Sequence, residues 1–532
     1  MTTERKCLHC GSTNIRSKGL RKNSNGEFRR FLCDDCGQKC QIPLNLLSPT
    51  VEDQAEDKKP KIKMIEPYLE FRKEFPNAKG FVVTCAINDT GVNKPFLAAL
   101  EAYCDAKKLK LLVIPVKYLN PSAMNTRDDC TWPPEVAPYL FHRTYTVDNV
   151  LKVIGDCNIQ ATATHPLTGI DGLTDGMTTI VGHPVVQMKT VPVNEWRDPI
   201  ILHSTGSVSL KNNYSASKAG YRASYHHCFA GVVVEFDKSK TFHIRQIMAD
   251  SNGGFYDLGD YWGPEGFERT DPADALVLGD EHLIFADANV QKATYFANDS
   301  IVQTLRPKVL VRHDVLDCFS VSSHHSNNFI LRYTKHRMPV DKHSIKAELR
   351  TTVDQLVATT PSWSKSLIVG SNHHDHLDRW LNIENGIKFD YVNAKIYHQL
   401  MYLMLSNIDK GIEKNAFRTY VEEVYKAPHD TIAFAEDGFE MHDIVLSMHG
   451  DRGPNGARGS ITNLSKIGEK AVIGHSHSPG IQAGCWQVGT SSLLRLEYNK
   501  GPSSWLHTHC VIYPNGKRQL ISVISGRWRA GK

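Results

Sequence analysis

Ala275-Leu276-Val277-Leu278 runs directly into Gly279-Asp280-Glu281-His282, so that an apolar segment ends in a polar block. The same arrangement recurs four times before Pro479. The later apolar runs are Val309–Val311, Leu367–Val369, Ile444–Leu446 and Ala471–Ile473, and the polar blocks after them are Arg312–Asp317, Gly370–Asp375, Ser447–Gly450 and Gly474–His477. Short apolar runs of this kind predict buried strands. The polar blocks then lie where strands end in loops, which is where α/β folds build their sites.

The side chains of these blocks favour metal binding. Aspartate, asparagine and histidine supply oxygen and imidazole ligands, a mixture that suits manganese, iron or zinc better than calcium. The blocks lack the thiolates of a structural zinc site. Of the 25 histidines in the chain, 15 lie from His282 to His477, so the composition points to the same region as the motifs.

The order of the blocks resembles a known family. Asp-x-His, then Asp, then Asn-His, then a single His, then Gly-His-x-His is similar to the calcineurin-like metallophosphoesterase superfamily. The gaps from Asp280 to Asp314, Asn372, His449 and His475 look most like its double-strand-break-repair nuclease branch. The resemblance implies an α/β fold for residues 268–532, with two packed mixed β-sheets flanked by helices. It also implies two divalent ions, with Mn²⁺ favoured over Mg²⁺, Fe²⁺ or Zn²⁺.

The resemblance also implies roles for individual residues. Asp314 would bridge the two ions, joined on one of them by Asp280, His282 and His477 and on the other by Asn372, His449 and His475. His373 would protonate the leaving group or stabilise its charge, and Asp317 would hydrogen-bond a neighbouring ligand or the backbone. Asp-x-His works physically because alternate residues of an extended segment project to the same side.

The chain departs from the family pattern at two blocks. His313 stands where glycine is usual, and Ser371-Asn372-His373-His374 replaces a Gly-Asn-His that an acid commonly follows. We expect His374 or Asp375 to take over the supporting role of that acid. His324 and His325, further along the second loop, are either substrate contacts or surface histidines.

The remaining composition is that of a soluble globular protein of two or three domains. The chain has 532 residues, is 41% hydrophobic and carries a formal charge of +5, which is too small to argue for nucleic acid by itself. No apolar run approaches the ~20 residues of a membrane span, and the N-terminus lacks a signal-peptide core. Thirteen cysteines without a secretory signal favour reduced thiols and metal binding. We therefore expect a cytoplasmic protein, in the host cytoplasm if it is viral, with no membrane partner.

Residues 1–45 predict a small zinc ribbon. Cys7-Leu8-His9-Cys10 and Cys33-Asp34-Asp35-Cys36 are two C-x-x-C knuckles separated by 22 residues. Four thiolates at this spacing can close one tetrahedral zinc site, and Cys40 could substitute for a neighbour. So small a segment has little core, and the metal would supply most of its folding free energy.

The same segment is basic between its knuckles. One acid, Glu27, accompanies six cations, which are Arg16, Lys18, Arg21, Lys22, Arg29 and Arg30. It resembles the zinc ribbons at the ends of transposases and transcription factors, and a DNA-contacting arm and a solvated basic hairpin both remain open. Residues 46–66, polar and charged with Pro49 and Pro60, predict a linker.

Residues 67–267 predict a second α/β domain, to which we assign no activity. A strand at 80–86, a helix at 94–109 and a strand at 111–116 form a βαβ pattern, which favours a locally parallel sheet. For the loop Asn88–Lys94 we favour turn chemistry with a helix N-cap over a phosphate site, because it lacks P-loop glycine spacing. We expect further strands at 200–203 and 229–236, a long polar loop at 211–227, and a connection at 248–274.

Together these features predict a two-metal DNA endo- or exonuclease with an N-terminal zinc ribbon. The architecture loosely resembles the pre-early proteins with which some tailed coliphages degrade host DNA. The alternatives are a phosphomonoesterase or nucleotide phosphodiesterase, and a non-enzymatic DNA-binding protein with a scaffold domain. Homo-oligomerisation stays open. After Pro479 we expect strands at 491–498, 510–513 and 519–524, with His507 and His509 serving strand packing or exposed to solvent instead of binding metal.

Overall fold

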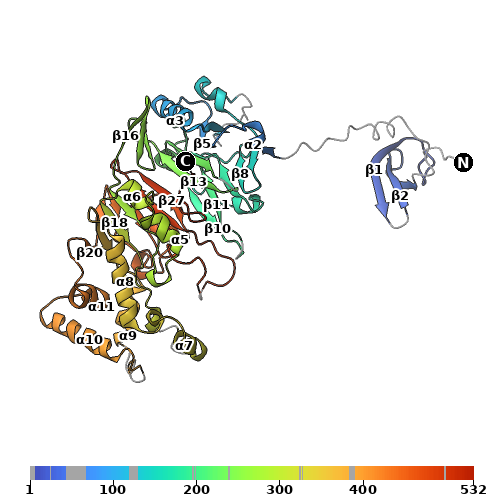
Figure 1. Cartoon of the computed structure of the whole chain (residues 1–532). Helices are drawn as coiled ribbons and strands as arrows, with labels where there is room; N and C mark the ends of the chain where they lie inside the picture. Colours follow the sequence, from blue (N-terminus) through green and yellow to red (C-terminus); the bar gives the residue numbers. More distant parts are fainter. Residues whose placement is uncertain are drawn as a thin grey trace. The chain divides into compact units, whose positions relative to one another are not determined.

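The computed structural model describes residues 6–23, 26–43, 68–118, 130–194, 197, 199–237, 240–322, 325, 328–382, 387, 390–496 and 499–531. It divides the chain into two compact units, Met1–Pro67 and Tyr68–Lys532 (Figure 1). The predicted linker 46–66 and His324 lie outside the described residues, as does the side chain of Lys22.

The first unit is a three-stranded antiparallel sheet. Its strands are β1 (Ile15–Asn23), β2 (Gly26–Cys33) and β3 (Lys39–Pro43), in that order across the sheet. Its core consists of Phe31, Cys40 and Ile42, with Ile15 packed against them. Four apolar side chains cannot offset the conformational entropy of about 40 ordered residues. The unit therefore needs another source of folding free energy.

The predicted βαβ pattern is confirmed in the second unit. Strand β5 (Gly80–Ile87) leads into helix α3 (Lys94–Lys107), which returns to β6 (Lys110–Val116), parallel to β5. The Asn93 side chain accepts a hydrogen bond from the Phe96 amide, so the loop before α3 is the expected N-cap turn. These strands belong to a four-stranded sheet in the order β13 (Phe242–Met248), β12 (Ala230–Phe236), β5, β6.

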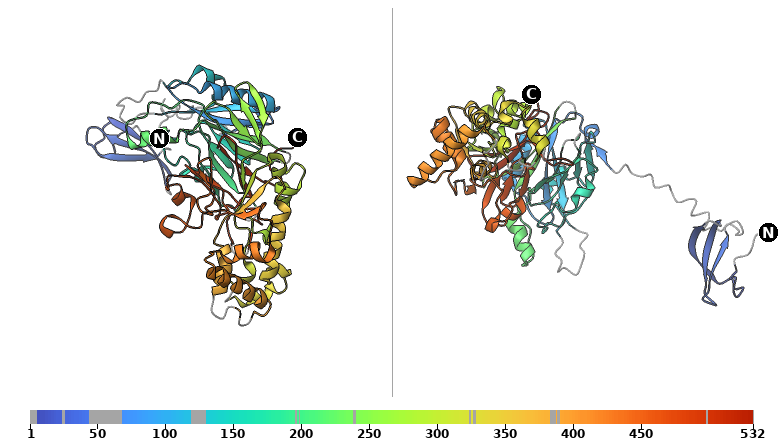
Figure 2. Two further views of the ribbon diagram at one scale, coloured as in Figure 1. Left: turned by 90° about the vertical axis from the view of Figure 1, so that its left-hand side faces the viewer. Right: turned by 90° about the horizontal axis from the view of Figure 1, so that it is seen from below.

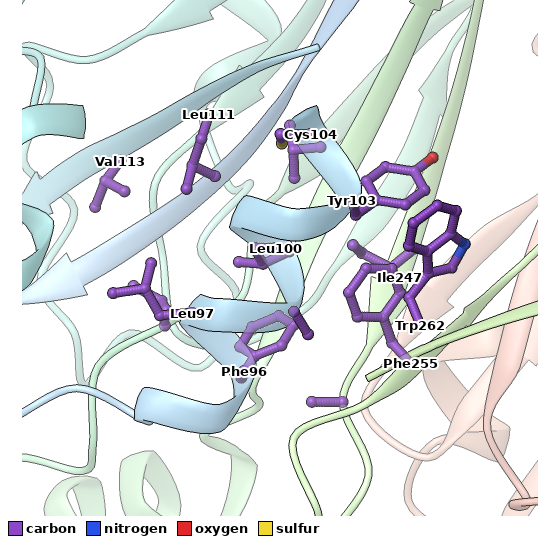
Figure 3. Close-up of a cluster of buried hydrophobic side chains, with 14 of the residues drawn as sticks. Phe96, Leu97, Leu100, Tyr103, Cys104, Leu111, Val113, Ile247, Phe255 and Trp262 are labelled. Atoms are coloured by element: carbon purple, nitrogen blue, oxygen red, sulfur yellow. The ribbon is translucent and has the colours of Figure 1, made fainter. Parts of the chain in front are cut away.

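Helix α3 buries one face against a second, three-stranded sheet as well. Phe96 and Tyr103 pack edge-on against Phe255, and Tyr103 also packs against Trp262 (Figure 3). Phe255 and Trp262 belong to β14 (Phe255–Asp257) and β15 (Asp260–Gly263), which pair with β16 (Gly266–Thr270). Residues 248–274, predicted as the connection into the last domain, thus contain a three-stranded sheet that packs along α3, which the sequence analysis did not predict.

The predicted polar loop at 211–227 was wrong in part. It contains helix α4 (Lys218–His226), whose N-cap Ser217 accepts a hydrogen bond from the Gly220 amide. Gly220 and Ala223 are the buried positions of this helix. Their small size lets a polar sequence pack as a helix, which an apolar periodicity would not have indicated. The neighbouring strand β11 (Ile200–Ser204) is confirmed.

An eleven-stranded mixed sheet joins segments that are distant in sequence. Its order is β21 (Glu440–Met441), β22 (Ile444–Val445), β23 (Lys470–Ile473), β25 (Cys485–Gln487), β24 (Gly480–Gln482), β10 (Met188–Val191), β11, β9 (Thr178–Val181), β8 (Leu151–Ile154), β7 (Thr144–Val147) and β4 (Leu69–Glu70). The junction is the pairing of Met188 with Ile481. The predicted boundary between residues 267 and 268 stays a prediction, although segments on its two sides share this sheet.

A six-stranded sheet carries the first polar blocks. Its order is β20 (Ile432–Phe434), β19 (Lys365–Ile368), β18 (Val309–Arg312), β17 (Ala275–Val277), β26 (Thr508–Ile512) and β27 (Arg518–Ser522). Strands β17, β18, β19 and β20 pair in parallel. All five predicted apolar runs thus form strands, within one or two residues of the predicted ends.

The six-stranded and eleven-stranded sheets pack face to face. Ala275 and Val277 of β17 share a buried core with Val472 and Trp486 of the larger sheet. The alternate residues Leu276 and Leu278 pack on the other face, in a cluster with side chains of helices α5 (Ala288–Gln291) and α6 (Ile301–Leu305). The structure is therefore an α/β fold with packed mixed sheets and helices outside them.

Further helices cover the outer face of the six-stranded sheet near β19. Helix α8 (Ile345–Thr359) packs with Ile368 of β19 in one cluster that also holds residues of α9 (His374–Asn382), α10 (Ala394–Asp409) and α11 (Ala416–Thr419). These helices gather at one end of the second unit, away from α3 and β5 (Figures 1 and 2). Among the described residues no helix is long and apolar enough to span a membrane.

Candidate metal centre

The proposed ligands converge at the ends of neighbouring strands. Asp280 and His282 follow β17, Asp314 follows β18, and Asn372 follows β19. His449 follows β22, and His475 and His477 follow β23. Because β17, β18 and β19 run parallel, as do β22 and β23, their carboxyl ends lie together where the two packed sheets meet.

Four of the ligand side chains form a tight buried cluster. Ligand atoms of Asp280, His282, Asp314 and His477 all lie within 4.8 Å of one another. His477 Nε2 is 3.2 Å from Asp280 Oδ2, and His282 Nε2 is 3.7 Å from Asp314 Oδ2. These are the four residues that the family resemblance assigns to one ion.

The remaining residues extend the cluster from Asp314. His449 Nε2 lies 3.0 Å from Asp314 Oδ2. This is the same oxygen that His282 Nε2 approaches to 3.7 Å. His475 Nδ1 is 3.1 Å from Asn372 Oδ1, and the His475 ring centroid is 5.4 Å from that of His449. Among the described His, Cys, Asp and Glu residues, His475 belongs to no group of three or more whose ligand atoms all lie within 4.8 Å of one another. Asp314 thus lies between two sets of ligands, the second of them looser.

Several ligand atoms have no hydrogen bond although they are fully buried. Among the described residues these include Oδ1 of Asp280 and Oδ1 of Asp314, whereas Asp280 Oδ2 and His449 Nε2 have only the imidazole–carboxylate contacts of 3.2 and 3.0 Å given above. A buried carboxylate oxygen without a partner is costly unless a cation is close to it. Hard oxygens and imidazole nitrogens are a ligand set for Mn²⁺, Fe²⁺ or Zn²⁺. The residues present therefore fit divalent ions.

The backbone at the ligands is strained. His282, Asp314, His475 and His477 have φ of +37°, +45°, +75° and +59°, in the left-handed region that non-glycine residues seldom adopt. Strain of about 1–3 kcal/mol at each such residue is typical of functional sites. The backbone at Gly474 lies so close to the Asp280 carboxylate that a Cβ on Gly474 would be 2.1 Å from Asp280 Oδ1.

Two proposed auxiliary residues contact the cluster. Asp317 Oδ2 lies 2.8 Å from His282 Nδ1, which orients this ring so that Nε2 faces the other ligands. His373 Nδ1 donates a hydrogen bond to the Asp317 carbonyl oxygen, at 2.9 Å. His374 instead packs against the Phe417 ring, and Asp375 bonds to Arg452. These two therefore do not have the supporting role expected of one of them.

The electrostatics of the cluster favour charged carboxylates. Burial raises the pKa of Asp314, but His449, His373 and His282 outweigh it and hold that pKa well below its ordinary value. Burial lowers the pKa of both His282 and His449. The carboxylates of Asp317 and Asp314 outweigh burial at His282, and Asp314 outweighs it at His449. Each pKa therefore rises to about 9. The metal-free cluster is thus held together by imidazolium–carboxylate pairs.

These pKa shifts predict that metal binding depends on pH. Coordination needs neutral imidazoles, so below about pH 9 an incoming ion must displace protons from His282 and His449. The pairs stabilise the metal-free fold below pH 6.5, and this contribution is lost as pH rises through about 9. We therefore expect MnCl₂ to raise Tm more at about pH 8.5 than at pH 6.5, and metal affinity to rise by up to about 100-fold per pH unit. Scanning calorimetry and titration calorimetry measure the two effects, and a pH-independent affinity would contradict the assignment.

Sequence reasoning missed a buried ion pair beneath the ligands. Arg312 Nε and Nη2 donate to the Glu281 carboxylate at 2.7 and 2.8 Å, and both side chains are fully buried. Tyr295 and Thr359 hydrogen-bond to the same pair. Glu281 lies between Asp280 and His282, and Arg312 precedes His313 and Asp314, so the pair ties two ligand loops together. The signal in the sequence was an arginine directly after Val309–Val311.

His313, the residue that replaces the usual glycine, lies inside the centre. It is fully buried, and its Nδ1 is 3.3 Å from Nδ1 of His449. Ligand atoms of Asp280, His313 and His449 form a further group within 4.8 Å. His507 and His509 lie outside the centre, as expected. His509 accepts a hydrogen bond from the Gly279 amide, and His507 bonds to the Ser492 carbonyl.

The expected strand at 491–498 is absent from the described residues of that range. Instead, residues 489–492 make isolated contacts that support the first ligand loop. The Asp280 amide donates to the Gly489 carbonyl, and the Ser491 amide donates to the Asp280 carbonyl. The isolated bridges join Thr490 to Asp280 and Ser492 to Ala286, in a segment after β17 that is not itself a strand.

A cavity of about 1140 Å³ opens beside the centre. Asn372, His373, His475 and His477 contribute to its lining, together with Asp317 and His325. Gln187–Thr190 of β10 and its flanking residue also line it, so the region of unassigned role contributes to the site. A substrate group in this cavity would lie next to the proposed ligands.

The four knuckle cysteines form a second candidate site, in the first unit. Their sulfur atoms lie within 4.8 Å of one another, with Cys7–Cys36 and Cys10–Cys33 separations of 3.6 Å. Backbone amides of Cys10 and His9 lower the pKa of Cys7 to about 6, whereas burial and the neighbouring thiols raise the pKa of Cys10 and Cys36, so Cys7 is the thiol of these three that most readily becomes the thiolate that zinc requires. Neither Cys40 nor His9 belongs to this group.

Removal of the metal from this site should unfold the first unit. Zinc in small cysteine sites supplies about 10–16 kcal/mol, far more than four apolar side chains can replace. We expect Cys33→Ser to lose one bound zinc and to make residues 1–67 sensitive to limited proteolysis, with the second unit unchanged. Cys40→Ser is the matched control, since Cys40 is buried in the same unit but outside the sulfur cluster. Equal zinc contents in both variants would contradict the prediction.

The basic residues of the first unit differ in how available they are. Lys18, Arg21 and Arg30 are exposed. Arg16 forms an ion pair with Asp34 at 2.6 Å, and Arg29 is only 6% exposed. Arg29 is therefore poorly placed for a phosphate, because its neighbours in the sheet cover it.

Comparison with known proteins decides the family. The chain is 31% identical over 476 residues to "Protein A1" of Escherichia phage T5, an alignment that covers 86% of this chain and 84% of the phage T5 protein. The chain belongs to the protein A1 family. No family model matches it, and no solved structure matches it. Membership of the A1 family supports the phage relationship expected from the sequence.

Proposed function

We propose that this member of the A1 family is a two-metal phosphodiester hydrolase that acts on DNA. The observation that carries the proposal is Asp314, a buried carboxylate lying 3.0 Å from His449 and 3.7 Å from His282, between two sets of oxygen and imidazole ligands. A shared carboxylate is what a pair of ions about 3.5–4 Å apart requires. The calcineurin-like metallophosphoesterase fold, with its two packed mixed sheets, is part of this proposal.

The residues would hold the ions in two groups. Asp280, His282 and His477 would bind one ion and Asn372, His449 and His475 the other, with Asp314 shared. When bound, two divalent ions supply activation of a water and neutralisation of charge on the phosphate. Manganese is the metal we favour, on the mixture of oxygen and imidazole ligands.

His373 has the position of a proton donor. Its Nδ1 hydrogen bond to the Asp317 carbonyl fixes the ring, and the ring lines the cavity. The other nitrogen, Nε2, is then the one that can give a proton to the oxygen that leaves the phosphorus atom. Histidine is the side chain that most often transfers a proton in reactions of this kind.

DNA as substrate is supported by two features. The cavity lining includes two cations, Lys189 and Arg458, and one carboxylate, Asp317, which is bonded to His282. The first unit presents Lys18, Arg21 and Arg30 on a four-cysteine ribbon. Such exposed cations suit phosphate contacts, and binding through them would weaken steeply with salt.

A single-turnover digest with MnCl₂ tests the proposal. Supercoiled, linear duplex and single-stranded DNA are offered, alongside an aryl phosphate ester. We expect the wild type to cut DNA and His373→Ala to be about 10²–10⁴-fold slower while it still binds metal. His429→Ala, an exposed histidine in another loop, is the matched control and should cut normally. Hydrolysis of the ester without DNA cleavage would favour the phosphomonoesterase alternative, and inertness toward both would favour a binding scaffold.

A further inference from the structure

The cavity has a lining that the proposed hydrolysis does not use. Besides the candidate ligands, it is formed by Gln187–Thr190, by Arg458–Ile461 and Asn463 at the start of helix α12 (Ile461–Leu464), and by Trp505. The three segments are more than 40 residues apart in the chain. Their convergence beside a phosphate-hydrolysing centre points to a binding subsite for the rest of the substrate.

Trp505 is the aromatic side chain best placed to contact a substrate. It is half-buried, it lines the cavity, and its ring centroid lies 4.1 Å from the ring of His477 at an interplanar angle of 66°. Phe319 also lines the cavity, but it is only 4% exposed and packs against Phe285. Trp505 therefore presents aromatic surface directly beside a proposed metal ligand.

Most of the polar groups that line the cavity together with Trp505 are uncharged. Gln187, Gln482, Gln487 and Asn463 bring amide groups to the lining, and Ser460, Ser476 and Ser478 bring hydroxyls. Among the described lining residues Asp317 is the one carboxylate, and of the two cations Lys189 is paired with Asp171 and Arg458 is exposed. Amides both donate and accept hydrogen bonds, which suits the edge of a heterocyclic base. The lining thus suits an aromatic heterocycle next to an anion.

We propose that Trp505 is the stacking platform for a nucleobase adjacent to the scissile phosphate, so that DNA is bound as a single strand. This inference rests on the proposed function. A base can stack on an indole ring only when its face is uncovered, and inside a duplex, away from its ends, both faces are covered by neighbouring base pairs. A duplex substrate must therefore be opened near the cut.

A thermodynamic cycle tests the stacking. The probes are a fluorescently labelled oligothymidylate and an abasic strand of the same length, with CaCl₂ in place of manganese to measure binding alone. We expect Trp505→Ala to weaken oligothymidylate binding about 5- to 150-fold, the range for loss of one base–aromatic stack. The same substitution should leave abasic-strand binding unchanged, because that strand has no base to stack. Equal weakening for both strands would show that Trp505 acts through His477, and would overturn the proposal.

Two variants and one further substrate sharpen the test. Trp505→Phe keeps an aromatic face and should recover most of the lost affinity. Trp363→Ala removes a partly exposed tryptophan that packs under Arg306 outside the cavity, and should bind both strands like the wild type. A duplex of the same sequence should bind at least about tenfold more weakly than the single strand. Equal affinity for duplex and single strand would contradict the inference.

The failure of this inference is distinguishable from the failure of the proposed function. If the wild type hydrolyses no DNA but the binding cycle holds, the catalytic proposal fails and the base subsite stands. If DNA is cut and Trp505→Ala leaves both oligothymidylate binding and the KM for single strands unchanged, the subsite is wrong and the hydrolase stands.

Discussion

Replacing Asp314 with asparagine is expected to reduce the rate of phosphodiester hydrolysis by at least about 10³-fold. Asparagine keeps the shape of the buried side chain but removes the negative charge that both groups of ligands share. Stabilisation of the transition state by metal ions amounts to several kcal/mol, and each 1.36 kcal/mol corresponds to a factor of ten in rate. Single-turnover rates with MnCl₂, together with the metal content of the purified variant, measure the effect.

A matched control separates loss of the metal centre from general damage. Asp409→Asn changes an exposed aspartate at the end of α10 and should hydrolyse DNA like the wild type. Circular dichroism of Asp314→Asn should retain the signature of a folded α/β protein. If the Asp314→Asn protein bound two ions and cut DNA at the wild-type rate, the assignment of Asp314 as the shared ligand would be wrong.

The largest expected effect on stability comes from the buried pair of Glu281 and Arg312. Arg312→Met should lower the free energy of unfolding by about 3–5 kcal/mol, because it leaves the Glu281 carboxylate buried without its cation. Glu281→Gln should have a similar cost. Because these residues adjoin Asp280, His282 and Asp314, metal affinity should also fall by about 10- to 100-fold. Urea denaturation of the metal-free proteins and titration with MnCl₂ give the two quantities.

The double variant Glu281→Gln with Arg312→Met distinguishes the pair from two independent contacts. Removing both charges eliminates the unpaired buried charge, so the double variant should be less destabilised than the sum of the single variants. Arg350→Met is a suitable control, because its ion pair with Asp354 joins side chains that are 73% and 50% exposed and should contribute about 0–1 kcal/mol. Additive losses in the double variant would show that the pair does not act as a unit.

Predictions from local pattern were accurate where one segment carried its own signal. Ala275–Leu278 alternates between two buried faces, and the structure puts Ala275 and Val277 in one core and Leu276 and Leu278 in another. The helix beginning at Lys94 was marked by Asn93, which caps it. Patterns of this kind depend only on the period of the backbone and on the chemistry of neighbouring residues.

Predictions were wrong where small residues or distant partners determine the structure. Residues 211–227 contain no apolar stripe, and α4 forms there because Gly220 and Ala223 allow close packing. Residues 489–493 contact the loop that holds Asp280 and His282, and they make isolated bridges with it instead of a strand. In neither segment does the local sequence indicate which distant residues it will contact. Tertiary packing therefore overrides local propensity.

The residues alone were enough to predict the kinds of ligand, their order along the chain and the strands that precede them. Asp280 and His282 share one block, Asp314 and His477 belong to two others, and their chemistry indicates a candidate metal centre before any fold is known. Their approach within 4.8 Å, by contrast, follows from the packing of two sheets whose strand ends meet. The same packing brings Gln187–Thr190 and Trp505 to the cavity. No local pattern encodes such contacts, because they arise only when segments hundreds of residues apart share one buried core.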